Sequence, residues 1–488
     1  MTTSVFNNLE PRPVWEHFAT LCAIPRASKR EAALRDHLLA WARARGLETR
    51  VDAAGNLILR KPASPGRENR PGVILQGHLD MVCQKNASTV HDFRHDPIRP
   101  VLQDGWLVTP DTTLGADNGI GVALALAALE DPDLAHPPLE VLLTVDEEAG
   151  MGGARALAPG TLSGQYLINL DTEEWGEFYL GCAGGMDVEA TRACTREPPP
   201  ADHVVWRLAV SGLRGGHSGI DIHLHRGNAI RLLVESLSML AREMNARLIT
   251  LEGGSARNAI PREAFCVVAL PAAHARGLPA WLEHILADWK QRLAGIDDGI
   301  QLACEPISDS ASQTLAPRDQ AALLDFLQAA PNGVAAMSED FPGVVETSDN
   351  LGVASLAGDA CRAVFMVRSL KDEAALALAD GLLGQAANHG FQARKVGPYP
   401  GWTPNPASPL LALGRRVYQA TFGRPARLQV IHAGLECGLL AASHPGLDMI
   451  SFGPDIRGAH APGERVEIRS VGQCWVLLQA MLKELAEC

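Results

Sequence analysis

Histidine and carboxylate side chains recur in this sequence close to short, apolar segments that a folded chain would bury. These residues are His78, Asp80, Asp117, Glu147, Glu148, Asp171 and His460. Histidine nitrogens together with carboxylate oxygens suit zinc, manganese or cobalt, and a set without cysteine argues against a structural thiolate zinc site. Burying several carboxylates without a cation would be costly, so their joint placement favours a metal centre.

The set is large enough to hold two metal ions. Hydrolytic two-metal centres hold their ions roughly 3.5–4 Å apart and need an anionic bridge between them. Five ligands, one of them a bridging carboxylate, would give each ion three protein contacts and leave positions for water and substrate. Taken singly, each residue also fits a simpler role: His78 could be a hydrogen-bonded loop residue, Asp117 a helix N-cap and Asp171 a turn cap.

Four short apolar segments must position these residues. They span residues 73–76, 139–145, 166–170 and 448–452. Segments this short and continuously apolar predict strands buried on both faces, as in a mostly parallel sheet covered by helices. Residues 119–129, rich in Ala, Leu and Val, predict a helix between two of them, which indicates an α/β domain. Ligands of such sheets bind outside the carboxyl ends of the strands, so we expect the polar residues to converge there.

The pattern changes between about residues 187 and 397. Strands and helices there follow one another in two rounds, and residues 253–260 have a weak local echo in residues 346–353. We expect an inserted α+β lid domain built from two similar halves. The chain then divides into residues 1–186, the first part of the catalytic domain, residues 187–397, a lid or dimerisation-type domain, and residues 398–488, the second part.

Composition limits the partners and the location. The 488 residues are 47% hydrophobic, enough for two or three buried cores. The formal net charge of −13 argues against nucleic acid or an anionic membrane as a partner. The N-terminus has no signal-peptide pattern, no segment has the roughly 18 consecutive apolar residues of a membrane helix, and the ten cysteines are scattered. We therefore expect a cytoplasmic protein.

Five motifs resemble the metal-binding motifs of the two-zinc aminoacylase/carboxypeptidase-type metallopeptidases. They are Gly77-His-Leu-Asp80, Leu114-Gly-Ala-Asp-Asn-Gly119, Asp146-Glu-Glu148, Asn169-Leu-Asp171 and Gly458-Ala-His460. Within that family the sequence is most similar to the bacterial aminoacyl-histidine dipeptidases, which are carnosinase-like X-His dipeptidases. The resemblance runs almost from end to end and includes the loop Gly215-Gly-His-Ser-Gly219. It implies hydrolysis of dipeptides, X-His and β-alanyl-histidine among them, with two zinc ions, or cobalt or manganese, per chain.

The resemblance also implies a role for each residue of the set. One ion would take His78 and Asp171, the other Glu148 and His460, and Asp117 would bridge them. Asp80 would accept the far ring N–H of His78 and fix its tautomer. Glu147 would be the general base that takes a proton from the metal-activated water and later passes it to the leaving amine.

Three residues of the predicted insert are candidates for substrate contacts. His217 is either a turn residue in its Gly-rich loop or, as the family implies, a donor to the oxyanion formed at the scissile carbonyl. Arg368 resembles the family arginine that holds the substrate carboxylate, a task that suits a bidentate guanidinium. Without that resemblance it would be a solvated arginine on an edge strand. Asn258 is a candidate for a polar contact to the substrate.

Two other functions remain open at this point. A related amidohydrolase would act on N-acyl amino acids or longer peptides, and a non-catalytic relative would keep the fold while losing ligands or the base. A serine hydrolase is disfavoured because the sequence has no G-x-S-x-G motif. The expected partner is a small dipeptide, and a homodimer is also open.

Overall fold

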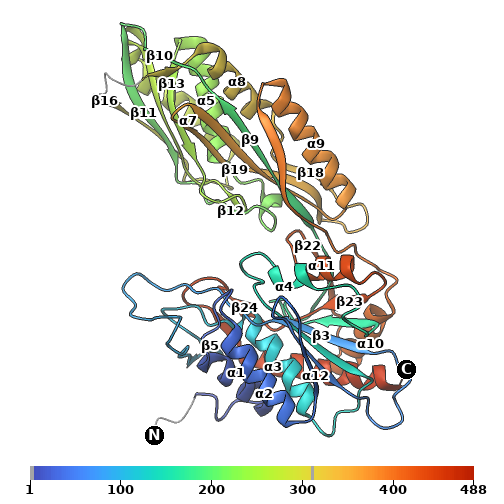
Figure 1. Ribbon diagram of the computed structural model, residues 1–488. Coiled ribbons are helices and arrows are strands. Elements are labelled where there is room, and N and C mark those ends of the chain that lie inside the picture. The colour runs from blue at the N-terminus through green and yellow to red at the C-terminus, as the bar shows by residue number, and fades with distance from the viewer. Residues whose placement is uncertain (1–4, 309–312, 488) are drawn as a thin grey trace. The chain divides into compact units, whose positions relative to one another are not determined.

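The structure is a computed structural model that describes residues 5–308 and 313–487. It divides into two compact units. The first unit comprises Met1–Gly181, Trp402–Val430 and Leu435–Cys488, and the second comprises Cys182–Gly401 and Ile431–Gly434. The predicted insert, residues 187–397, lies within the long segment of the second unit. Each unit has its own large sheet and its own helices (Figure 1).

An eight-stranded sheet forms the centre of the first unit, in the order β1-β2-β6-β3-β7-β23-β8-β22. These strands are β1 (Glu48–Val51), β2 (Leu57–Lys61), β3 (Val73–His78), β6 (Leu139–Thr144), β7 (Tyr166–Asn169), β8 (Glu177–Cys182), β22 (Arg427–Ile431) and β23 (Asp448–Ser451). The four strands predicted from the apolar segments, β3, β6, β7 and β23, are neighbours and pair in parallel. Every residue of β3 and β6 is buried, as expected for a sheet covered on both faces.

Helices cover this sheet. They are α1 (Arg12–Ala23), α2 (Ala32–Ala44), α3 (Ala116–Glu130), α4 (Gly152–Ala156), α10 (Pro409–Phe422), α11 (Glu436–Ser443) and α12 (Ile468–Glu487). Helix α3 is apolar all round because it packs against β3 on one side and α1 on another. Helix α10 has clear end signals: Ser408 caps its first turn, Pro409 begins it, and Gly423 ends it with φ 72°.

A small sheet in the first unit, in the order β24-β25-β5-β4, positions the last predicted ligand. Its strands are β4 (Val101–Gln103), β5 (Trp106–Val108), β24 (Ile456–Arg457) and β25 (Arg465–Glu467). Strands β24 and β25 pair antiparallel, so the segment between them is a hairpin loop. His460 lies in this loop.

The second unit has a nine-stranded sheet in the order β16-β11-β15-β13-β19-β20-β9-β21, with β18 paired to β19. Its strands are β9 (Gly184–Ala193), β11 (His203–Ser211), β13 (Arg247–Gly253), β15 (Ala264–Pro271), β16 (Gln301–Ile307), β18 (Gly333–Met337), β19 (Val345–Ala357), β20 (Ala360–Ser369) and β21 (Gln392–Tyr399). Short elements complete it: β10 (Arg196–Glu197), β12 (Gly216–His217), β14 (Ala259–Ile260), β17 (Thr314–Leu315), the 3-10 helix Ile222–Leu224 and α6 (Ala272–Ala275). The sheet packs its apolar face on α5 (Ala229–Met244), α7 (Leu278–Arg292), α8 (Pro317–Ala329) and α9 (Asp372–Asn388).

The predicted α/β class is confirmed, with one difference in detail. The two segments whose sequences are locally similar adopt different structures. Residues 253–260 run from the end of β13 through a loop into β14, whereas residues 346–353 lie inside the long strand β19. Among residues 5–308 and 313–487, no helix is both long and apolar enough to cross a bilayer.

Candidate metal centre

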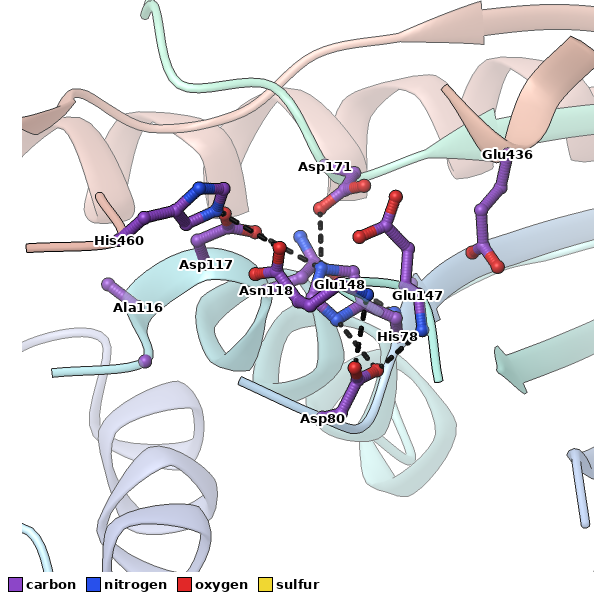
Figure 2. Close-up of polar contacts among 12 residues, drawn as sticks. His78, Asp80, Ala116, Asp117, Asn118, Glu147, Glu148, Asp171, Glu436 and His460 are labelled. Atoms are coloured by element: carbon purple, nitrogen blue, oxygen red, sulfur yellow. Dashed lines mark hydrogen bonds and ion pairs between the residues drawn. The ribbon is translucent and has the colours of Figure 1, made fainter. Parts of the chain in front are cut away.

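The five predicted ligands of the first unit lie together at the carboxyl edge of its parallel strands (Figure 2). His78 is the last residue of β3, Glu148 follows β6, and Asp171 follows β7. Asp117 lies at the start of α3, and His460 comes from the β24–β25 loop. His78, Glu148 and Asp171 therefore meet because parallel strands end at the same edge, and the start of α3 and the β24–β25 loop add Asp117 and His460.

Asp117 stands between the two histidines. Its Oδ1 lies 3.1 Å from Nε2 of His78, and its Oδ2 lies 3.1 Å from Nε2 of His460. Each histidine also meets a second carboxylate: Nε2 of His78 is 3.3 Å from Asp171 Oδ1, and Nε2 of His460 is 3.1 Å from Glu148 Oε2. The five side chains thus form two groups of three that share Asp117.

The chemistry of this set fits divalent cations. Ligand atoms of His78, Asp117 and Glu148 all lie within 4.8 Å of one another. Among the described residues, no hydrogen-bond partner is found for the buried atom Glu148 Oε1, and the buried Asp171 Oδ1 has only its ion pair with His78. Burial, together with the charges of Asp117 and Glu148, raises the pKa of Asp171 to about 6. A cation would supply the missing partners and relieve the repulsion among the carboxylates.

The backbone before Asp117 has a special conformation. Gly115 has φ 69°, and a Cβ atom at this position would lie 2.4 Å from Nη2 of Arg26. Only glycine fits there, both for its φ and for this close approach. The peptide bond between Asp117 and Asn118 is cis.

Asn118 is a residue that the sequence analysis missed. Its side-chain oxygen accepts a hydrogen bond from the backbone N–H of His78, and its side-chain nitrogen donates to the carbonyl of Leu170. These atoms are 3.3 Å and 2.6 Å apart. Asn118 therefore ties the strand ends that carry His78 and Asp171 to the start of α3. Asn118 directly follows Asp117 in the motif Leu114-Gly-Ala-Asp-Asn-Gly119, and this position was the sequence feature that could have identified it.

Asp80 is fully buried and has contacts beyond the predicted one. Its Oδ1 lies 3.4 Å from Nδ1 of His78, the predicted partner. Oδ1 also accepts from the backbone N–H of Glu147 at 3.0 Å, and Oδ2 accepts from the N–H of Glu148 at 3.1 Å and from Ser28 Oγ at 2.7 Å. Burial opposes ionisation, yet these hydrogen bonds and His78 lower the pKa of Asp80 to about 2. Asp80 thus fixes the turn that carries both glutamates.

The carboxylate of Glu147 lies in a strongly negative environment. Burial and the charges of Asp171, Glu148 and Glu436 raise the pKa of Glu147 well above its usual value, while His78 opposes the shift. The sequence left the role of Glu436 open, with the substrate pocket as one possible place, and its side chain is fully buried. It accepts hydrogen bonds from Gln76 Nε2 at 2.7 Å and from Thr144 Oγ1 at 2.6 Å.

Two predicted substrate-binding residues, His217 and Arg368, lie together in the second unit. Arg368 belongs to β20, an interior strand between β19 and β9, and is only 4% exposed. The alternative of a solvated edge-strand arginine is therefore wrong. Its Nη1 donates to the hydroxyl of Tyr399 at 2.8 Å, and its Nη2 lies 3.5 Å from His217 Nε2.

The ring of His217 has a defined orientation. Its Nδ1 accepts hydrogen bonds from the backbone N–H groups of Gly219 and Ile220, at 3.2 and 3.0 Å. A neutral imidazole whose Nδ1 accepts must carry its proton on Nε2. Nε2–H and the guanidinium of Arg368 are then two neighbouring donors, an arrangement that suits an anionic oxygen. Asn258 is exposed, and its carbonyl accepts from the N–H of Ser218 at 2.8 Å, so its loop adjoins that of His217.

Known proteins resemble this chain along nearly its whole length. A sequence model of Peptidase family M20/M25/M40 matches residues 74–484. The cytosol non-specific dipeptidase of Escherichia coli (strain K12) is 44% identical over 485 residues, 99% of either chain. The structure of an aminoacylhistidine dipeptidase from Vibrio alginolyticus matches with a TM-score of 0.88 and 44% identity, covering 99% of this chain and 98% of that one. The aminopeptidase PepT of Bacillus cereus ATCC 10987 shares the fold, with a TM-score of 0.56 and 17% identity over 98% and 99% of the two chains.

Proposed function

The chain belongs to peptidase family M20/M25/M40. We propose that the first unit holds the two-metal centre of a dipeptidase, formed by His78, Asp117, Glu148, Asp171 and His460. The observation that carries this proposal is the position of Asp117. Each of its oxygens faces a different histidine at 3.1 Å, and each histidine has a carboxylate of its own. Two cations that share one carboxylate need this arrangement.

The residues around the centre divide the chemical work. Divalent cations bound there supply Lewis-acid polarisation of a carbonyl oxygen and lower the pKa of a water molecule. Glu147 takes up the proton of the attacking water on a carboxylate oxygen and returns it to the leaving nitrogen. Asp80 holds the backbone of Glu147 and Glu148, so that the base and the neighbouring ligand keep their separate positions.

In the second unit, Arg368 and His217 would bind the substrate's oxygens. The guanidinium suits a free C-terminal carboxylate, and Nε2–H of His217 suits the oxygen of the scissile carbonyl, which becomes negative during attack. Tyr399 holds Arg368 in place through its hydroxyl group. Asn258 is proposed as a polar contact on the adjoining loop.

Three finer assignments complete the proposal. The ions would be zinc, with cobalt or manganese as alternatives, because imidazole and carboxylate ligands suit all three. The substrates would be dipeptides, X-His and β-alanyl-histidine among them, which the names of the two relatives at 44% identity support. The name of the Escherichia coli relative likewise supports a cytoplasmic location.

A substrate panel tests the carboxylate contact. We expect β-alanyl-histidine and other X-His dipeptides to be cleaved well, and their C-terminal amides and tripeptides poorly. Leaving a buried guanidinium unpaired typically costs on the order of 2–5 kcal/mol. Efficient hydrolysis of N-acetylhistidine instead would favour the amidohydrolase alternative.

The variant Arg368→Ala should narrow the gap between the dipeptide and its amide by harming the dipeptide selectively. Arg362→Ala is the matched control, since Arg362 lies on the same strand but is exposed and pairs with Glu189 at 3.2 Å. The measurement is kcat/KM for both substrates in wild type and both variants. Equal values for dipeptide and amide in the wild type would rule out the carboxylate contact.

A further inference from the structure

A buried glutamate outside the predicted set binds the backbone that carries Asp117. Glu464 is 2% exposed and lies in the β24–β25 loop, which also contains His460. Its Oε2 accepts from the N–H groups of Leu114 and Gly115, at 2.7 and 2.9 Å. Its Oε1 accepts from those of Ala116 and Asp117, at 2.8 and 3.4 Å.

The same backbone segment is held from its carbonyl side by Arg26. This arginine is fully buried, and its Nη2 donates to the carbonyl of Gly115. Its Nη1 donates to the carbonyls of Leu79 and Asp80, at 3.0 and 2.8 Å. Residues 114–117 are therefore fixed through their N–H groups by Glu464 and through the carbonyl of Gly115 by Arg26, which also binds the segment that follows His78.

This arrangement suits an anion at the position of Glu464. Residues 114–117 precede the regular part of α3, since Asp117 and Asn118 have non-helical φ and ψ angles. Buried backbone N–H groups need an acceptor, and here the carboxylate of Glu464 supplies one. Glu464 is buried and reaches this segment from a loop about 350 residues away along the chain. Its four contacts also join two ligand-bearing loops, those of Asp117 and His460.

We propose that Glu464 is a positioning residue of the metal centre. It fixes the backbone of Asp117 so that Oδ1 and Oδ2 face separate ions. It also holds the Asp117 carboxylate at a fixed position relative to His460, which lies in the same loop as Glu464. The inference rests on the proposed two-metal site. Outer groups that orient metal ligands typically change metal affinity by 10–100-fold when they are altered.

Glu464→Gln is a sharp test because it keeps the size of the side chain. Each carboxylate oxygen accepts two N–H groups, so the amide NH₂ of glutamine would face two donors whichever way it turned. We expect the variant to bind Mn²⁺ 10–100-fold more weakly than wild type. In the electron paramagnetic resonance spectrum, the exchange-coupled signal of a bridged Mn²⁺ pair should give way to that of separate ions. The Mn²⁺ affinity of Glu464→Asp should lie between those of wild type and Glu464→Gln.

Asp297→Asn is the matched control for a general loss of stability. Asp297 is 1% exposed, belongs to the second unit, and accepts from the N–H groups of Arg214 and Gly227, both at 2.7 Å. This variant should lower the melting temperature and leave Mn²⁺ binding unchanged.

The experiment titrates metal-free full-length protein with Mn²⁺ and records affinity, stoichiometry, spectrum and melting temperature. Weaker binding and a lost pair signal in Glu464→Gln support the proposal. Wild-type binding and spectrum in a folded variant overturn it, even if the melting temperature falls as in the control. If Glu464→Gln does not fold, Glu464→Asp decides by the same criteria. A wild-type protein that binds no Mn²⁺ pair would instead refute the proposed two-metal site.

Discussion

Replacing Asp80 by asparagine should damage the metal centre, although Asp80 is not itself a proposed metal ligand. Both oxygens of Asp80 accept backbone N–H groups, from Glu147 at 3.0 Å and from Glu148 at 3.1 Å. An asparagine offers one oxygen and one NH₂ group, so one of these N–H groups must lose its acceptor in either orientation. The turn that carries the proposed base and a proposed ligand would then lose one of its two anchors.

The size of the effect follows from these contacts. A hydrogen bond to a charged group contributes about 1.5–3 kcal/mol, and the N–H left buried adds a similar desolvation cost. We therefore expect Asp80→Asn to lower the free energy of unfolding by about 3–6 kcal/mol. A displacement of about 1 Å in a catalytic group costs about 100-fold in rate, so kcat should fall by roughly that factor.

The assay pairs urea unfolding with steady-state kinetics on an X-His dipeptide. Ser28→Ala is the matched control, because it removes only the hydroxyl that donates to Oδ2 of Asp80 at 2.7 Å. Loss of this hydrogen bond should cost about 1.5–3 kcal/mol of stability, with kcat near that of wild type. An Asp80→Asn protein with wild-type stability and wild-type kcat would show that Asp80 does not anchor the turn.

Three further predictions concern the roles of Glu147 and Glu148, the buried Asp349 and the contact of Tyr399 with Arg368. Glu147→Gln should lower kcat by orders of magnitude while metal analysis still finds two ions per chain. Glu148→Gln should instead weaken metal binding. If the two effects were swapped, the assignments of base and ligand would have to be exchanged. Burial raises the pKa of Asp349 to about 7, so stability should fall as pH rises from about 4 to 7, because the folded state keeps a proton that the unfolded state has lost. The Asp349→Asn variant should lack this pH dependence of stability. Its free energy of unfolding should exceed that of wild type by up to about 4 kcal/mol at pH 8 but not at pH 4. If the free energies of unfolding of the two proteins changed in parallel across that range, the raised pKa of Asp349 would be contradicted. Tyr399→Phe removes the hydroxyl that holds Arg368, about 1 kcal/mol, and should raise KM for dipeptides about fivefold with little change in kcat; an unchanged KM would count against that contact.

Much of the fold could be predicted because burial leaves a clear pattern in the sequence. Strands β3, β6, β7 and β23 are continuously apolar since helices cover both faces of their sheet, and the predicted segments match their bounds closely. The family resemblance inferred from the motifs at the ends of these strands is confirmed by the match over residues 74–484. The structure brings the five predicted ligands together, and their individual roles remain predictions.

Residues that act through the backbone could not be found in this way. Glu464 and Arg26 bind main-chain N–H and carbonyl groups of residues 114–117, and such contacts impose no spacing that a sequence pattern would reveal. Glu436 is buried among strands although its residue type is usually exposed, so composition gave no hint of its position. The burial of Arg368 was also unpredictable, because strand order decides whether β20 is an edge or an interior strand.

One measurement tests directly whether Asp117 bridges two metal ions. A crystal of the zinc-loaded protein, with anomalous diffraction recorded on both sides of the zinc absorption edge, locates each ion independently of the protein coordinates. We predict two peaks about 3.5–4 Å apart, each at about 2.0–2.2 Å from a different oxygen of Asp117. One peak should lie at His78 and Asp171, the other at Glu148 and His460. A single peak, or a pair that does not share Asp117, would contradict the account.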